Sequence, residues 1–160
     1  MLITSISVNE NNGTNDFILS NMNFGKQLNN KVIYNSLFTP ISYSTSLCNF
    51  INIYIAFQLN INLKHICENK YCKFDVIRNI HVIESLSQIE RDILFSYQEM
   101  MSDKKKPIFV IANELSKAQI KLTNTTLRPN TTFMLKISGI WENNSSYGLS
   151  YKYSVVQRTR

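Results

Sequence analysis

The chain has 160 residues and is 44% hydrophobic and 18% charged, with few Gly and Pro residues. This composition supports a folded core and excludes a wholly disordered or fibrous protein. The length suits one domain, because a single core usually organises about 100–200 residues, so we expect residues 1–160 to form one domain. The most apolar stretch, residues 50–63, carries several amide side chains, which excludes a membrane span of roughly 20 apolar residues.

The net charge is +6, and its distribution along the chain is uneven. Basic and acidic residues balance over residues 1–114, whereas residues 115–160 hold seven basic residues against Glu142 alone. A basic segment favours anionic partners such as nucleic acid, although lysines also serve simply to keep a protein in solution. Both interpretations remain open at this point.

The three cysteines cannot all pair within one chain, and the first residues lack the basic and apolar regions of a signal peptide. We therefore expect an intracellular, reducing compartment. Cys67 and Cys72 lie near two histidines in the sequence, but their C-x4-C spacing without a second cysteine pair is poor for zinc. Free thiols are the better interpretation, and we expect no metal and no other cofactor.

The expected elements begin with a short strand at residues 2–8 and a polar, loop-rich region over residues 9–30. The strongest pattern follows at residues 50–64, where hydrophobic side chains occupy every odd position from Ile51 to Leu63. This alternation predicts a long strand with one buried face. At about 3.3 Å per residue the run would span roughly 50 Å, so we expect strong curvature across a barrel, with a break at a hairpin or bulge as the alternative.

A second strand at residues 71–76 is expected to pair with the first as a hairpin. The hydrophobic period then changes to three and four, which predicts a helix over residues 85–101 with two overlapping capping-box patterns at its start. A short buried strand is expected at residues 108–111. Residues 112–123 are compatible with either a helix or a strand.

Two alternating runs, residues 132–141 and 147–156, flank a polar loop and predict a C-terminal hairpin. If the loop is symmetric, Lys136 lies directly opposite Lys152 on one face of the hairpin. The other face is apolar and shares its parity with Trp141, which we therefore place in the core.

Two lysines directly across a ladder repel each other and cost a few tenths to ~1 kcal/mol relative to a neutral pair. A phosphate backbone bound to Lys136 and Lys152 would relieve this repulsion, and Ser138 and Ser150, also expected to face each other, would hydrogen-bond its oxygens. The alternatives are that both lysines splay into water or that a bulge offsets them.

Aromatic residues on the polar face of the predicted strand 50–64 are candidates for stacking against bases. Tyr54 and Phe50 occupy that face, although aromatics that pack beneath loops would show the same pattern. The expected cations at the rim of the binding surface are Lys64, Lys117, Lys121 and Arg128.

Motifs that carry common enzyme chemistries are absent from the sequence. It has no glycine-rich phosphate loop of the Walker or Rossmann type, no G-x-S-x-G and no H-E-x-x-H. Its only histidines, His65 and His81, lie within apolar patterns that favour structural roles. We therefore expect a protein that is not an enzyme.

Residues 133–143 (FMLKISGIWEN) and 147–153 (YGLSYKY) resemble the C-terminal hairpin of OB-fold single-stranded DNA-binding proteins encoded by large double-stranded DNA viruses. The resemblance covers about 25 of the 160 residues. An OB-fold commonly places a helix between its third and fourth strands, which agrees with a helix at residues 85–101. The resemblance implies a protein that supports replication or repair by coating single strands.

The fold class that we expect is mainly β with one clear helix (α+β), arranged as an OB-like curled antiparallel barrel with a C-terminal β-hairpin. The expected function is non-catalytic binding of single-stranded DNA in viral DNA replication or repair, in the host nucleus or cytoplasm. The alternative is a structural or virion-type interaction protein that assembles through exposed strand edges. The choice between DNA and RNA and the oligomeric state stay open, and no membrane partner is expected.

Overall fold

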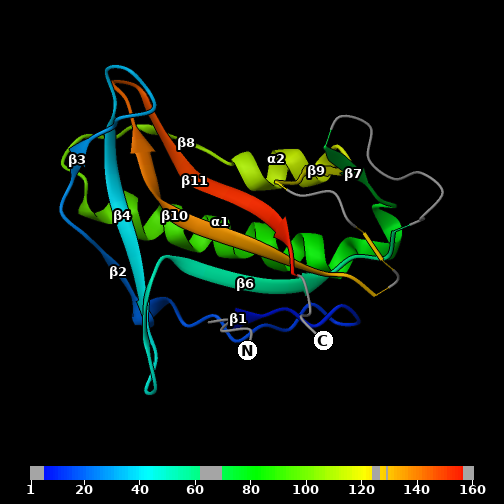
Figure 1. Cartoon of the computed structure of the whole chain (residues 1–160). Helices are drawn as coiled ribbons and strands as arrows, with labels where there is room; N and C mark the ends of the chain where they lie inside the picture. Colours follow the sequence, from blue (N-terminus) through cyan, green and yellow to red (C-terminus); the bar gives the residue numbers. More distant parts are fainter. Residues whose placement is uncertain (1–5, 62–69, 124–126, 129, 157–160) are drawn as a thin grey trace.

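The computed structural model describes residues 6–61, 70–123, 127–128 and 130–156. The strands are β1 (Ile6–Ser7), β2 (Met22–Phe24), β3 (Leu28–Asn29), β4 (Leu37–Ser44), β5 (Asn49–Ile51), β6 (Ile53–Gln58), β7 (Tyr71–Lys73), β8 (Lys106–Ile108), β9 (Gln119–Lys121), β10 (Thr132–Glu142) and β11 (Ser146–Val155). The helices are α1 (Ile80–Met100) and α2 (Val110–Ser116), and short 3-10 turns, η1 (Leu19–Asn21) and η3 (Ile77–Asn79), precede β2 and α1. The protein is thus mainly β with helices, which confirms the α+β class (Figure 1).

The main sheet is built around β10, which forms the expected C-terminal hairpin with β11. On its other side β10 has two successive partners: β6 pairs with its first half, from Thr132 to Ile137, and β4 pairs with its end, from Gly139 to Glu142. β1 extends the sheet beyond β6 and β8 extends it beyond β11, both in parallel. A single central strand therefore holds together segments from both halves of the chain.

The sheet is open, so the expected OB-like barrel is wrong. Its strand order is β1-β6-β10-β11-β8, and within the described ranges the outer strands β1 and β8 do not pair with each other. The barrel prediction depends on one long, curled strand over residues 50–64. Instead Asn52, at φ +85°, interrupts that strand between β5 and β6, and β6 ends at Gln58.

The break at Asn52 also reverses the side-chain alternation. Ile51, expected in the core, is 83% exposed, whereas the odd positions from Ile53 to Leu59 are buried as predicted. A residue in the left-handed region turns the backbone, so the side chains before and after it do not continue one pattern.

The hydrophobic core lies between the sheet and α1, which runs along one face (Figure 1). Leu86, Ile89 and Ile93 of α1 are buried there, as their spacing predicts. The helix begins five residues earlier than expected, because Ser85 lies inside the helix and is buried instead of capping it. The Asn79 side chain just before α1 instead binds the backbone of Asn60.

The segments before and after α1 differ from expectation. β7 pairs with β9 in a separate two-stranded sheet, and no pairing of β7 with β6 is seen in the part of the chain that the structure describes. The strand expected at residues 108–111 lies earlier in the chain, as β8 (Lys106–Ile108), because α2 begins at Val110. The ambiguous residues 112–123 contain both alternatives, the end of α2 and β9.

A buried carboxylate fixes the start of α2. Glu90 of α1 is fully buried, and its two oxygens accept hydrogen bonds from the backbone N–H groups of Ile111 (2.9 Å) and Ala112 (2.8 Å). Burial raises the pKa of Glu90, and these backbone bonds partly offset that effect. A side chain from another helix thus satisfies N–H groups that a helix start leaves unpaired.

Neither helix of the described residues is long and apolar enough to cross a membrane. The region at residues 9–30, expected to be loop-rich, contains η1, β2 and β3 between longer irregular segments. β2 and β3 both pair with β4, which lengthens the sheet beyond the C-terminal hairpin.

Candidate functional site

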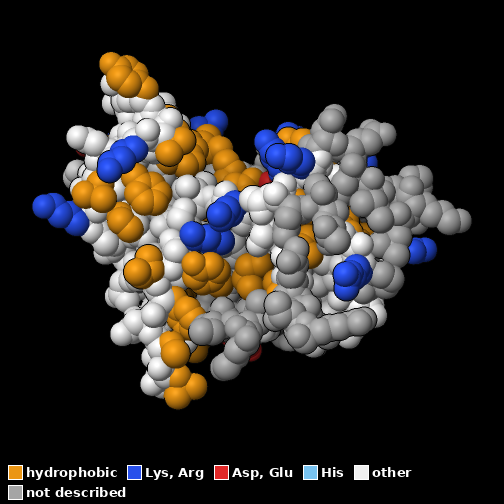
Figure 2. Space-filling model, viewed as in Figure 1, with side chains coloured by type: hydrophobic (Ala, Val, Ile, Leu, Met, Phe, Trp, Pro, Cys, Tyr) orange, Lys and Arg blue, Asp and Glu red, His pale blue; other side chains and the backbone are white. Residues whose placement is uncertain are grey.

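One face of the main sheet is turned away from α1, and we call it the outer face. Figure 2 shows it in the orientation of Figure 1, with Lys and Arg side chains set among hydrophobic ones and few acidic groups between them. Because side chains alternate along a strand, the residues between the core positions of β6, β10 and β11 point to this face. These are the residues that the sequence pattern singled out.

Three residues form a row across the middle of the outer face. Lys136 of β10 pairs with Lys152 of β11 on one side, as predicted, and with Tyr54 of β6 on the other. The Lys136 Nζ lies 5.9 Å from the centroid of the Tyr54 ring, a distance suited to a cation–π contact. Lys152 is exposed and Lys136 is partly buried. We call these three residues the lysine–tyrosine row.

Next to this row lie two serines whose expected pairing is only partly right. Ser138 is the extra residue of a β-bulge, so Ser150 pairs with Gly139 and not with Ser138. The Ser138 hydroxyl nevertheless donates to the Ser150 carbonyl (3.1 Å) and lies 3.2 Å from the Ser150 hydroxyl. The two hydroxyls therefore stay together on the outer face.

The bulge overturns the expected position of Trp141. Beyond Ser138 the inward and outward positions of β10 are exchanged, so Ile140 is fully buried and Trp141 is only partly buried. One inserted residue shifts the alternation by one place. Trp141 thus lies on the outer face with the lysines and not in the core.

Trp141 forms one wall of an apolar groove of about 640 Å³, which we call the Trp141 groove. Its lining residues are Leu28, Asn29, Asn30, Lys31, Val32, Ile33, Phe38, Ser138, Trp141 and Ser150. Sequence reasoning missed the residues from β3, β4 and the connection between them. The one signal for them is the alternation of Thr39, Ile41 and Tyr43 in β4, all three of which are buried.

Phe50, the second expected stacking residue, does not lie beside Tyr54. Asn52 separates the two, and Phe50 of β5 pairs with buried Tyr43 and packs against the core. The alternation that placed both aromatics on one face is broken at Asn52. Phe50 is therefore removed from the candidate site.

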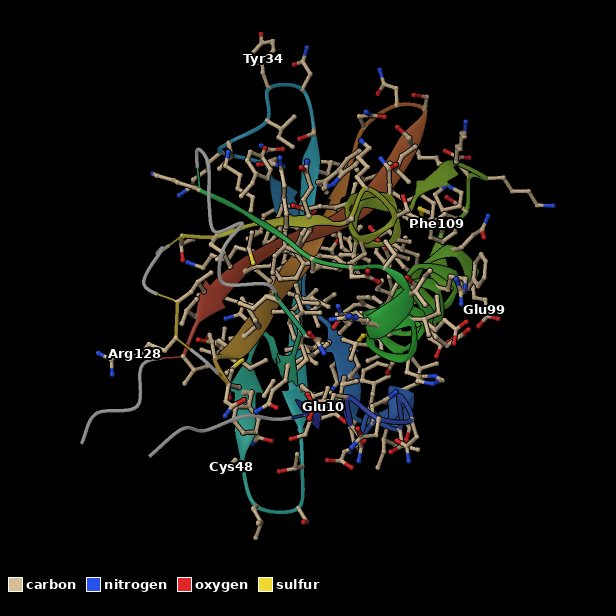
Figure 3. All side chains as sticks on the ribbon, turned by 90° about the vertical axis from the view of Figure 1, so that its right-hand side faces the viewer. Glu10, Tyr34, Cys48, Glu99, Phe109 and Arg128 are labelled. Atoms are coloured by element: carbon tan, nitrogen blue, oxygen red, sulfur yellow. The ribbon has the colours of Figure 1, made fainter. Side chains whose placement is uncertain are left out.

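The expected rim cations fall into separate places. Arg128 is exposed before the start of β10, and Figure 3 shows it on the opposite side of the molecule from Glu99 and Phe109. Lys117 follows α2, and Lys121 lies on β9 with its Nζ 6.0 Å from the centroid of the Tyr71 ring. Lys64 lies outside the described residues.

A polar cluster lies on the opposite, inner face of the hairpin. The Glu142 carboxylate accepts hydrogen bonds from Lys105 (2.5 Å), from the Tyr97 hydroxyl (2.7 Å) and from Gln27 (3.1 Å). Burial disfavours the charged carboxylate, but the bonds from Lys105 and Tyr97 outweigh it and hold the pKa of Glu142 below its usual value. These groups satisfy one another and join the hairpin to the end of α1.

The cysteines and histidines form no metal site in the described chain, where no three His, Cys, Asp or Glu side chains are grouped to hold an ion. Cys48 is an exposed free thiol and Cys72 a buried one, while Cys67 lies outside the described residues. His81 is exposed on α1, and His65 also falls outside the described ranges.

The chain was compared with protein-family models, curated proteins and solved structures. No protein-family model, no curated protein and no solved structure matches the chain.

Proposed function

We propose that the protein binds single-stranded nucleic acid on the outer face of its main sheet. The observation that carries the proposal is the lysine–tyrosine row, in which Lys152, Lys136 and Tyr54 lie side by side on three neighbouring strands. Two adjacent cations attract the phosphates of one strand, and an aromatic ring beside them offers a surface for a base.

The surroundings of the row favour a single strand over a duplex. Trp141 and Phe38 add two more aromatic rings on the same face, and rings contribute to binding by stacking on bases that are not already stacked in a helix. Hydroxyls of Ser138 and Ser150 lie between these rings and the lysines, where they are available to a phosphate or a sugar. The resemblance of the hairpin to viral single-stranded DNA-binding proteins points the same way.

A fluorescence-anisotropy titration with a labelled oligo-dT tests the proposal. We expect the wild-type protein to bind oligo-dT more tightly than a duplex of equal length at moderate salt. Changing Lys136 and Lys152 together to Gln should weaken binding at least about tenfold, because both phosphate contacts are lost.

The matched control changes two exposed lysines elsewhere, Lys73 on β7 and Lys104 after α1, to Gln. It removes the same net charge but leaves the outer face intact, so affinity should stay within about threefold of wild type. Equal losses in the two double variants would show general charge attraction only, and no binding at low salt would refute the proposal.

A second candidate, assembly with other protein chains, is favoured by exposed apolar side chains at two loop tips. Val32 and Leu47 are 92% and 90% exposed, in the loops at the two ends of β4. Figure 3 shows these two tips, marked by Tyr34 and Cys48, far apart on the molecule. The strand edges offer less, because β1 and β8 have two and three residues. Sedimentation of the free protein as a stable oligomer would support this candidate.

A further inference from the structure

The Trp141 groove opens beside the lysine–tyrosine row, and we propose that it takes in one unpaired nucleobase of the bound strand. This inference rests on the proposed function, since the phosphates of that strand are held by Lys136 and Lys152. It adds the part of the ligand that is recognised: the base itself, and only when it is free of a partner strand.

The groove and the row are continuous along two strands. Ser138 follows Lys136 by two residues on β10, and Ser150 precedes Lys152 by two residues on β11. Both serines line the groove, so about 7 Å of strand separates the cations from its wall. A nucleotide whose phosphate lies on the lysines can therefore reach the groove with its base.

The floor of the groove is aromatic and is held in place by two glycines. Trp141 pairs with Phe38 of β4 on one side and with Gly148 of β11 on the other. A Cβ atom at Gly148 would come within 2.8 Å of the Trp141 ring, and one at Gly139 within 2.5 Å of the Phe38 ring. Each ring thus occupies the space that a side chain on the glycine would need, which fixes both rings without any ligand.

The opposite wall is a short loop that is also preformed. The Asn30 side-chain oxygen accepts hydrogen bonds from the backbone N–H groups of Val32 (2.9 Å) and Ile33 (3.1 Å), which shapes the turn after β3. Val32 and Ile33 then present aliphatic side chains to the groove, 92% and 45% exposed. An apolar slot between the packed indole of Trp141 and this aliphatic wall suits a flat ring.

Charge selects a nucleobase over other apolar groups. Lys31 is the only charged residue among those that line the groove in the described chain, and the cations of the row lie beside it. We therefore expect the occupant to be a flat ring attached to an anion. Polar groups at the edge of that ring would hydrogen-bond to the Ser150 hydroxyl and the Asn29 amide. A base on a single phosphodiester strand meets all of these conditions, whereas a base in a duplex must first be unpaired and unstacked, at a cost of a few kcal/mol.

The test uses Trp141 as its own reporter, because it is the only tryptophan of the chain. The full-length protein is titrated with oligo-dT and with an abasic oligomer of the same length, which has the same phosphates but no bases. We expect oligo-dT to quench the tryptophan fluorescence and to bind at least about fivefold more tightly than the abasic oligomer, the lower end of base–aromatic stacking. The abasic oligomer should bind without quenching.

Two variants of the loop wall locate the base. Ile33→Ser and Val32→Ser should reduce the advantage of oligo-dT over the abasic oligomer, while binding of the abasic oligomer stays unchanged. Leu47→Ser is the matched control, because Leu47 is as exposed as Val32 but lies at the other end of β4. Its binding should equal that of the wild type.

The outcomes separate this inference from the function on which it rests. Equal affinity for the two oligomers without quenching overturns the base site and leaves the phosphate-binding function standing. Failure of both oligomers to bind at low salt overturns both. Quenching by an apolar peptide but by neither oligomer would also refute the base site, since the groove would then belong to a protein partner.

Discussion

Lys136 has two neighbours that act on its charge in opposite directions. Lys152, its cross-strand partner, repels it, at a cost of a few tenths to ~1 kcal/mol. The Tyr54 ring attracts it, and cation–π contacts at exposed sites contribute ~0.5–1 kcal/mol. The two effects nearly cancel, so the charge of Lys136 has little net influence on the stability of the free protein.

We therefore predict that Lys136→Gln leaves the free energy of unfolding within about 0.5 kcal/mol of wild type, because repulsion and attraction disappear together. Affinity for oligo-dT should fall, since a phosphate contact is lost. Thermal melts and anisotropy titrations measure the two effects. Clear destabilisation with unchanged affinity would mean that Lys136 is a packing residue and that the site is wrongly placed.

The Lys136→Glu variant tests whether the sign of the charge at position 136 determines stability and binding. The variant gains an ion pair with Lys152 of at most ~1 kcal/mol, and it places a negative charge where the phosphate is expected. It should bind more weakly than Lys136→Gln without being less stable. Changing both lysines to Glu restores the like-charge repulsion, so that variant should lose stability as well as binding.

Glu142 follows Trp141 in the sequence but faces the opposite side of the sheet, where Lys105, Tyr97 and Gln27 bind it. Its lowered pKa means that the folded state favours the carboxylate more than the unfolded state does. The resulting stability is fully present above the usual carboxyl pKa and is lost as the pH falls through the lower pKa of the folded state.

We predict that Glu142→Gln lowers the free energy of unfolding by about 3 kcal/mol at pH 7, because the positive charge of Lys105 then loses the carboxylate that pairs with it. The difference from wild type should shrink as the pH falls below the usual carboxyl pKa and through the lower pKa of the folded state, because the wild-type carboxylate is then protonated too. Urea unfolding at several pH values measures it. A difference that does not change with pH would show that the charge of Glu142 does not stabilise the fold.

At the scale of elements, the sequence pattern correctly predicted how β10 pairs with its neighbour in the chain, β11, up to the bulge. The hairpin register was correct from Phe133/Val155 to Ile137/Tyr151, because a hairpin's alternation sets which residues face each other. The bulge at Ser138 could not be predicted from the same pattern. It lies where β10 changes its partner from β6 to β4, a long-range contact that the hairpin sequence does not contain.

β4 was not among the expected elements, and it contains Pro40. A proline argues against a central strand, since it cannot donate a ladder hydrogen bond. Pro40 is tolerated here because β4 exchanges its neighbours close to it: β10 pairs up to Pro40, and β5 pairs from Ser42 onwards. β4 supplies Phe38 to the floor of the Trp141 groove, and the loop before β4 forms the opposite wall, so the sequence predicted the lysines of the candidate site but not its groove.

We predict that Gly139→Ala is strongly destabilising, by at least about 2 kcal/mol, because its Cβ would come within 2.4 Å of the Thr39 carbonyl oxygen and 2.5 Å of the Phe38 ring. The backbone atom cannot move without breaking the pairing of β4 with β10. Gly25→Ala is the control: its nearest neighbour would lie at an ordinary 3.4 Å, so the change should cost less than about 1 kcal/mol. Urea denaturation compares the two, and similar losses would contradict the close approach at Gly139.

At the scale of the whole molecule, the two faces of the sheet have different surroundings. α1 covers the inner face, and packing against it explains the alternation of buried positions along β6, β10 and β11. The outer face keeps lysines, hydroxyls and aromatic rings that the fold does not bury. Within the described residues, the basic residues after position 115 are divided between this face, through Lys136 and Lys152, the segment before β10, which carries Arg128, and the elements α2, which Lys117 follows, and β9, which carries Lys121.

This division predicts which cations set the salt dependence of binding. The logarithm of affinity should fall linearly with the logarithm of salt concentration, by roughly 0.7 for each phosphate neutralised on a single strand. A strand that follows β10 passes Lys136 and Lys152 and begins near Arg128, so Arg128→Gln should reduce the slope by about 0.7. Lys117→Gln, at the end of α2, should leave the slope unchanged although it removes the same charge.

If both variants reduce the slope equally, the nucleic-acid strand does not run along β10 and the positive charge acts through the molecule as a whole. If neither variant reduces the slope, the phosphate contacts are confined to the lysine–tyrosine row.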